Sequence, residues 1–200
     1  MAKTQIILTG GNDDWFSFAD TSYEVFAGAG DDRIFRLQTS TGDDVVHGGA
    51  GKDEIQVGAG YDTVEGGDGD DYIAAYESGW ISGDAGNDLI DVFGDSYDLF
   101  GGDGDDQIAS SASEARIHGG TGTARIFSNS AGSVWGAAGD DTIDCGIDNN
   151  VTIDVHGGSG NDRITGIGGD TKVIGHAEVG GGIAPVDVLL GVDDTLTDNV

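Results

Sequence analysis

The sequence predicts an all-β solenoid in which short parallel strands stack on one another. Three observations support this prediction: a composition poor in helix formers, a nine-residue repeat, and strand-forming residues at one position of that repeat. Among the 200 residues, 38 are Gly, 31 are Asp and one is Pro. Gly and Asp are both unfavourable in helix interiors, so a mostly helical protein is excluded. The hydrophobic fraction of 37% is too high for simple disorder, and the length suits a single domain.

The charge excludes several classes of function. Acidic residues number 37 against eight basic ones, which gives a net charge of −29. So few scattered cations cannot hold nucleic acid or an anionic membrane surface, and no apolar stretch is long enough to span a bilayer. A folded chain this acidic is expected to bind many cations. The lone Cys145 cannot form an internal disulfide, so covalent cross-links do not stabilise the fold.

The repeat is a block of nine residues with the form Gly-Gly-x-Gly-x-Asp-x-apolar-x. Its clearest copies are 48–56, 57–65, 66–74, 101–109 and 157–165. We call the sixth residue of each block the repeat Asp. Partial copies place it at Asp14, Asp32, Asp44, Asp88, Asp98 and Asp141, whereas Ala124 replaces it in one copy. The repeat Asp recurs every nine residues from Asp44 to Asp71 and about every 18 thereafter, so every second block after Asp71 has mostly lost its motif.

Each block predicts a turn followed by a short strand. Glycines permit positive φ and close approach of carbonyl groups, and the residues after the Asp alternate between the inside and the outside. The expected inward set is rich in β-branched residues, as stacked parallel strands favour. It comprises Phe16, Ile34, Val46, Ile55, Val64, Ile73, Ile90, Phe100, Ile108, Ile126, Ile143 and Ile164. Two blocks form a coil of about 18 residues, and about nine coils spaced about 4.8 Å apart form a flattened solenoid.

On these blocks the sequence resembles the RTX family of calcium-binding repeat proteins, also called hemolysin-type repeats. The resemblance covers residues 10–165 and extends weakly to 196. It implies a right-handed parallel β-roll in which each Ca²⁺ lies between turns on the same edge of adjacent coils. It also implies that turn carbonyls act as ligands. On this basis the expected carbonyl positions are Gly49, Gly51, Gly58, Gly60, Gly67, Gly69, Gly86, Gly102, Gly104, Gly158 and Gly160.

Calcium chemistry accounts for the abundance of Asp. Ca²⁺ takes six to eight oxygen ligands, and a short Asp carboxylate can fold back over its own turn where Glu would reach too far. The expected carboxylate ligands are Asp14, Asp32, Asp44, Asp53, Asp62, Asp71, Asp88, Asp98, Asp106, Asp141 and Asp162. Ala124 should interrupt the sites, so we expect about four to eight ions. An acidic solenoid without metal is disfavoured, because its stacked carboxylates would repel one another.

These carboxylates are expected to lie along the edges of the solenoid. One file is predicted to run through Asp53, Asp71, Asp88 and Asp106. A second file on the opposite edge pairs Asp44 with Asp62 and extends to Asp98, and Asp14 and Asp32 could begin a file near the N-terminus. Carboxylate pairs are so frequent that none can be singled out for acid–base catalysis.

The organisation predicted is a cap strand at 1–9, the roll at 10–165, and a degenerate coil or cap at 166–200 that could hold a secretion signal. The apolar run near the N-terminus is too short for a signal peptide, which needs about 7–15 residues. In the RTX family, calcium-dependent folding accompanies type I secretion of an unfolded chain. Disorder in a calcium-poor cytosol and folding outside the cell are therefore expected.

With the motif beginning near residue 10, we expect no separate catalytic domain and no enzymatic activity. A secreted structural protein is predicted, which forms a surface layer, matrix or filament by stacking through its open ends. One alternative is a cell-surface or polysaccharide-binding module that uses outward aromatic residues, namely Tyr76, Trp80, Tyr97 and Trp135. A phage virion component is a third alternative. No nucleic acid partner and no insertion into a membrane are expected.

Overall fold

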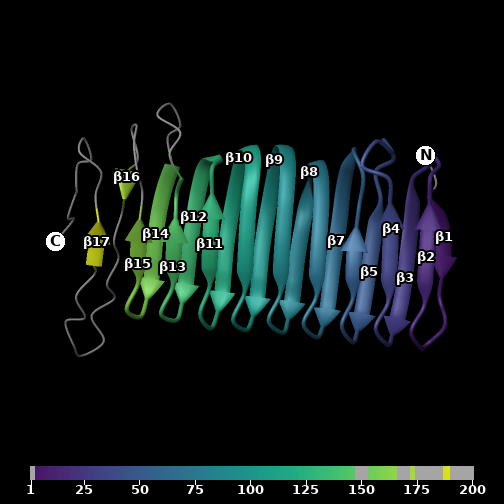
Figure 1. The fold of residues 1–200 in the computed structure, drawn as a ribbon, viewed down its shortest axis with the longest axis horizontal. Coiled ribbons are helices and arrows are strands. Elements are labelled where there is room, and N and C mark those ends of the chain that lie inside the picture. The colour runs from purple at the N-terminus through teal and green to yellow at the C-terminus, as the bar shows by residue number, and fades with distance from the viewer. Residues whose placement is uncertain (1–2, 147–152, 166–171, 174–186, 190–200) are drawn as a thin grey trace.

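The computed structural model describes residues 3–146, 153–165, 172–173 and 187–189. Parallel strands stack into a flattened solenoid of about nine turns, with the N-terminus at one end (Figure 1). This confirms the predicted all-β solenoid. The described chain holds strands and turns but no helix, and thus none with the length and apolar character that crossing a membrane requires. Most of the predicted 166–200 region lies outside the described residues.

The strands form two stacks. Stack one contains β1 (Thr4–Ile7), β3 (Tyr23–Ala29), β5 (Val45–Ala50), β7 (Tyr61–Asp68), β12 (Ala131–Ala138), β14 (Ile153–Ser159) and β16 (Lys172–Val173). Stack two contains β2 (Asp14–Ser17), β4 (Arg33–Arg36), β6 (Glu54–Gln56), β11 (Arg125–Ser128), β13 (Thr142–Asp144), β15 (Arg163–Thr165) and β17 (Asp187–Leu189). The long strands β8 (Tyr72–Ala85), β9 (Leu89–Asp103) and β10 (Gln107–Thr121) run through both stacks.

Each strand pairs in parallel with its equivalent in the next coil. In stack one, β3 pairs with β1 and β5, and in stack two β4 pairs with β2 and β6. Equivalent residues lie 17, 18, 19 or 21 positions apart in sequence, and 24 apart between β15 and β17. These values agree with the predicted coil of about 18 residues, and the longer ones correspond to coils with longer turns.

The core consists of two ladders of branched apolar side chains that face each other inside the solenoid. The ladder of stack one is Val25, Val46, Val64, Ile81, Leu99, Ile117, Val134 and Val155. The ladder of stack two is Ile34, Ile55, Ile73, Ile90, Ile108, Ile126, Ile143 and Ile164. All sixteen are buried, and burying one such side chain stabilises the fold by about 1.5–3 kcal/mol. Ten of the twelve predicted inward residues are among them.

The other two predicted core residues, Phe16 and Phe100, are outside the core. Phe16 is 50% exposed, because Trp15 rather than Phe16 is paired with the core residue Ile34. Phe100 lies on the outer surface, because Leu99 occupies the inward position of its coil. Both errors come from a register one residue away from the real one, since a shift by one residue moves a strand side chain to the opposite face.

A ladder of aromatic rings runs along the outside of stack one. Phe100, His118, Trp135 and His156 occupy equivalent positions in successive coils. Their ring centres are 5.0, 4.4 and 5.6 Å apart, and neighbouring rings are within 10° of parallel. Cross-strand aromatic pairs of this kind stabilise a sheet. The ladder therefore reinforces the register of four adjacent coils.

Candidate metal sites

A line of Asp residues follows one edge of the solenoid, where the chain passes from stack one to stack two. We call this the first edge. The line contains Asp13, Asp32, Asp53, Asp71, Asp88, Asp106, Asp141 and Asp162, with Ala124 in the position between Asp106 and Asp141. Oδ1 of each Asp after the first accepts the backbone N–H of the equivalent residue one coil earlier, at 2.7–3.0 Å. The N–H of Asp106 has no such acceptor, because the equivalent residue one coil later is Ala124, which carries no carboxylate.

The second carboxylate oxygen of these residues is buried without a hydrogen-bond partner. This holds for Oδ2 of Asp32, Asp53, Asp71, Asp88, Asp106 and Asp141. Each carboxylate folds back over its own turn, as the sequence predicted, and reaches the first Gly of the motif. A Cβ placed on Gly66 would lie 2.5 Å from Oδ2 of Asp71 and 2.7 Å from the carbonyl oxygen of Gly83 in the next coil. Oxygen atoms from two coils thus converge at this edge.

The turn glycines are required by the backbone itself. Gly51 and Gly69 have φ of 129° and 136°, and a Cβ on Gly69 would collide with the carbonyl oxygen of Gly51. Positive φ is likewise found at Gly49, Gly60, Gly67, Gly86, Gly102, Gly104, Gly158 and Gly160. Gly58 has ordinary φ, but a Cβ there would meet the carbonyl oxygens of Leu37 and Ser40. Ten of the eleven predicted glycines therefore adopt the conformation that favours Gly.

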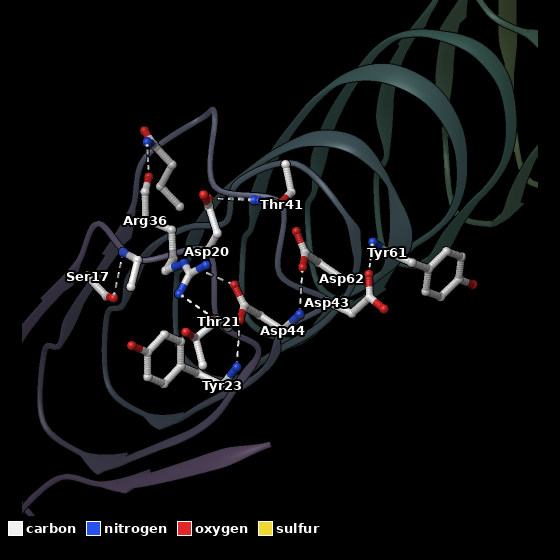
Figure 2. Close-up of polar contacts among 12 residues, drawn as sticks. Ser17, Asp20, Thr21, Tyr23, Arg36, Thr41, Asp43, Asp44, Tyr61 and Asp62 are labelled. Atoms are coloured by element: carbon white, nitrogen blue, oxygen red, sulfur yellow. Dashed lines mark hydrogen bonds and ion pairs between the residues drawn. The ribbon is translucent and has the colours of Figure 1, made fainter. Parts of the chain in front are cut away.

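The second edge, where the chain returns from stack two to stack one, carries a much shorter line. Oδ1 of Asp44 accepts the N–H of Tyr23, and Oδ1 of Asp62 accepts the N–H of Asp44, each at 2.8 Å (Figure 2). Oδ2 of both Asp residues is buried without a hydrogen bond. The line stops after Asp62, because the equivalent residues of the next two coils are Gly79 and Tyr97.

Two of the predicted ligand positions lie elsewhere. Asp14 is exposed and pairs in register with Arg33, so Asp13 rather than Asp14 is equivalent to Asp32. Asp98 lies on the outer face of β9, where both its carboxylate oxygens accept hydrogen bonds from Arg116 at 2.6 and 2.8 Å. Neither carboxylate is brought to the turns with the others. The second file consequently consists of Asp44 and Asp62 alone, and Asp32 joins the first-edge line.

The sequence interpretation missed a second ladder on the first edge. It is formed by the residue that precedes each repeat Asp, and its oxygen accepts the N–H of the equivalent residue one coil later, at 2.8–3.0 Å. Its acceptors are Asn12, Asp31, Asp70, Asn87, Asp105 and Asp140. The recurrence of Asp or Asn at the fifth position of the motif is the signal that could have revealed it. Four further Asp residues are explained by this ladder, namely Asp31, Asp70, Asp105 and Asp140.

Burial makes the ionised form of the repeat Asp residues unfavourable when no cation is bound. Burial, opposed by the backbone N–H and reinforced by neighbouring carboxylates, raises the pKa of Asp62 to about 8 and that of Asp71 to about 7. The same causes raise the pKa of Asp88 and Asp141 to about 6. A bound cation would reverse this effect, because it favours the carboxylate over the acid.

The donor set fits a hard cation. Within the described residues, no three His, Cys, Asp or Glu side chains gather as a metal-binding group. Side chains alone therefore do not form a coordination shell, and backbone carbonyls would have to complete it. Carboxylate and carbonyl oxygens in a flexible arrangement are the ligands that Ca²⁺ prefers, whereas transition metals favour nitrogen or sulfur. The unpartnered Oδ2 atoms are placed to bind such an ion.

Fold and site together define a parallel β-solenoid whose turns present oxygen ligands for metal ions. The sequence matches the family model described as RTX calcium-binding nonapeptide repeat (4 copies) over residues 36–64, 51–77, 98–113, 133–151 and 154–172. The chain belongs to this family and is an RTX calcium-binding β-roll protein. No curated protein and no solved structure matches it significantly.

Proposed function

We propose that calcium folds this chain outside the cell and that the folded roll serves a structural role by self-assembly. The observation that supports calcium-dependent folding is a set of seven buried Oδ2 atoms with neither a hydrogen bond nor an ion pair, those of Asp32, Asp53, Asp62, Asp71, Asp88, Asp106 and Asp141. Removing a carboxylate from water without a partner is costly. Ca²⁺ ions bound at several turns would be the partners of these carboxylates, so that the free energy of binding stabilises the fold.

The charge of the chain links this folding to location. At a net charge of −29 the calcium-free chain repels itself. Low calcium inside a cell would leave it unfolded and suited to export, and millimolar calcium outside would stabilise the roll by mass action. Export without a cleaved N-terminal signal, by a type I route, is part of this proposal.

No catalytic step is assigned to the roll, because its repeat Asp carboxylates accept hydrogen bonds from the backbone of neighbouring coils.

The N-terminal end of the roll supports the assembly part of the proposal. Among the described strands, β1 pairs with β3 and β2 pairs with β4, so the other edges of β1 and β2 carry no strand. The same coil exposes three large apolar side chains: Ile7 at 76%, Phe16 at 50% and Phe18 at 67%. An open strand edge flanked by apolar side chains is a template for pairing with another chain.

The experiment compares two pairs of substitutions in saturating calcium. We expect wild-type protein to form particles that grow with concentration in light scattering, and the Ile7→Ser/Phe18→Ser variant to stay monomeric with an unchanged circular dichroism spectrum. The matched control is Phe93→Ser/Phe127→Ser, which removes apolar side chains of 41% and 42% exposure from the sides of the roll. Wild-type protein that remains monomeric in calcium would contradict assembly, and so would equal loss of particles in both variants.

The geometry does not favour the polysaccharide alternative. A sugar stacks on the exposed face of an aromatic ring, yet both faces of Trp135 are covered by His118 and His156. Trp80 is tilted by 39° against Phe100, and Tyr97, expected to point outward, is only 2% exposed. Trp135 therefore has no free ring face, and Tyr97 is not accessible to a sugar. The aromatic residues are therefore explained by packing between coils.

A further inference from the structure

Arg36 occupies a position in the core that is otherwise filled by small or apolar residues. It ends β4, and the residue in the equivalent place one coil later is Val57. The following coils place Ala75, Val92 and Ser110 in this column. Arg36 is nevertheless 0% exposed and has the largest fully buried side chain of the described chain. A buried guanidinium is costly unless it is paired, so its partners indicate its role.

The guanidinium contacts one carboxylate and one carbonyl. Its Nε lies 3.1 Å from Oδ2 of Asp44, and its Nη1 donates to the carbonyl oxygen of Thr21 at 3.1 Å (Figure 2). The ring of Tyr23 covers it, with the ring centre 4.9 Å from the guanidinium carbon. Asp44 is a repeat Asp of the second edge, and Thr21 belongs to the turn one coil earlier. A repeat carboxylate and a turn carbonyl from adjacent coils are the oxygen types that converge at the first-edge turns.

Asp44 differs in this respect from the repeat Asp residues of the first edge. Of the ion pairs found in the described part of the chain, only that with Arg36 involves an Asp of the first-edge or second-edge line, since Asp98, the partner of Arg116, lies on the outer face of β9. The carboxylates of Asp53 and Asp71 have no cationic side chain at their Oδ2 atoms. The positive charge that a metal would bring to the first edge is thus supplied at Asp44 by the chain itself.

We propose that the guanidinium of Arg36 occupies the cation position at Asp44 in place of a calcium ion. The inference rests on the proposed calcium binding and deepens it, since it divides the roll into coils with an internal cation and coils that need metal. The negative charge of Asp44, in the turn that precedes β5, is then neutralised without calcium, which stabilises the pairing of β3 with β5. Asp62 is left as the second-edge carboxylate that needs an external cation.

The test measures bound calcium by equilibrium dialysis and amide protection by hydrogen exchange in wild type and in Arg36→Met. In chelator, we expect wild type to retain protection in β3 and β5, and the variant to lose it by about tenfold or more. Calcium should restore that protection in Arg36→Met, which should bind one more ion than wild type. An unchanged ion count together with no recovery in calcium would overturn the proposal, because Arg36 would then be an ordinary core ion pair.

Two further variants keep the test decisive. Asp44→Asn removes the carboxylate but leaves the buried guanidinium, so calcium should fail to restore its protection. Arg36→Gln has a shorter side chain that leaves more room for an ion. If Arg36→Met and Arg36→Gln both stay unfolded at saturating calcium, metal cannot replace the guanidinium and the proposal is wrong. If wild type itself binds no calcium, the proposed function fails as well, whereas wild-type binding without a gain in the variants defeats this inference alone.

Discussion

The backbone N–H of Asp53 donates to Oδ1 of Asp71, one coil later, at 2.7 Å, while Oδ2 of Asp71 has no hydrogen-bond partner. One oxygen of the same carboxylate therefore holds two coils in register, and the other remains available for a cation. This division explains why the repeat uses a carboxylate where an amide or hydroxyl could make the same hydrogen bond. It also separates the structural and the metal-binding contributions of each repeat Asp, so that they can be tested independently.

Replacing Asp71 by Asn should remove calcium binding at its turn while the hydrogen bond to Asp53 is kept. We expect Asp71→Asn to keep more strand content than wild type in chelator, because a buried charge is gone, and to be about 1–3 kcal/mol less stable than wild type in calcium. Asp68→Asn, an exposed acid of the same turn, is the control and should change neither value. Equal calcium stabilisation of all three proteins in urea unfolding would show that Asp71 binds no ion.

Stability without calcium should fall as the pH rises. The pKa values of Asp62, Asp71 and Asp88 are raised to about 8, 7 and 6 in the folded chain, above the unfolded value of about 3.9. The contribution of these groups is fully present below about pH 4 and is lost progressively up to about pH 8. The strand content in chelator, followed by far-UV circular dichroism, should show this decline, and calcium should stabilise the protein more at pH 8 than at pH 5. A strand content in chelator that rises with pH would contradict this expectation.

Installing the missing carboxylate should add a site. The side chain of Ala124 lies where the repeat Asp carboxylates fold back, next to Gly119 and the carbonyl oxygen of Gly136. Ala124→Asp would also provide an acceptor for the N–H of Asp106. We expect at least one more bound ion and a higher melting temperature in calcium, while Ala124→Asn should add the hydrogen bond without the ion. Equal ion counts by equilibrium dialysis in all three proteins would contradict the assignment of this edge.

The two ladders of the core predict a sharp contrast between neighbouring apolar positions. Ile90→Ala leaves a cavity between Ile73 and Ile108, and it should destabilise the calcium-loaded roll by about 2–5 kcal/mol. Leu89→Ala, at a residue that is 42% exposed, should cost much less. Urea unfolding in calcium measures both. Similar losses for the two variants would be inconsistent with the observed register.

The sequence was sufficient to predict the fold class and most of the first edge, because a strict nine-residue spacing leaves one inward position per strand. It was insufficient where an adjacent Asp offered a second register. Asp13 is found by counting two residues from Gly11, as Asp53 follows Gly51. The neighbouring Asp14 fits the motif equally well, because the apolar Phe16 stands two residues after it.

The second edge was harder to predict because its character changes along the roll. Beyond Asp62, the positions equivalent to the repeat Asp are occupied by Gly79 and Tyr97. A register shift between Glu77 and Ser78 also changes the pairing of β8 with β9 by one residue. Tyr97 is buried there with its hydroxyl donating to the carbonyl oxygen of Phe93 at 3.3 Å. Spacing alone could not show that Gly79 and Tyr97 replace the repeat Asp at these turns. Nor could it show that Arg36 is buried and pairs with Asp44.

A far-UV circular dichroism titration after chelation can show whether calcium supplies the missing partners of the buried carboxylates. We expect a cooperative transition from a largely unfolded chain to a strand-rich one as Ca²⁺ is added, and no such transition with Mg²⁺, which demands a more regular shell and gives up its water reluctantly. A chain that shows the full strand spectrum in chelator, unchanged by calcium, would contradict this expectation.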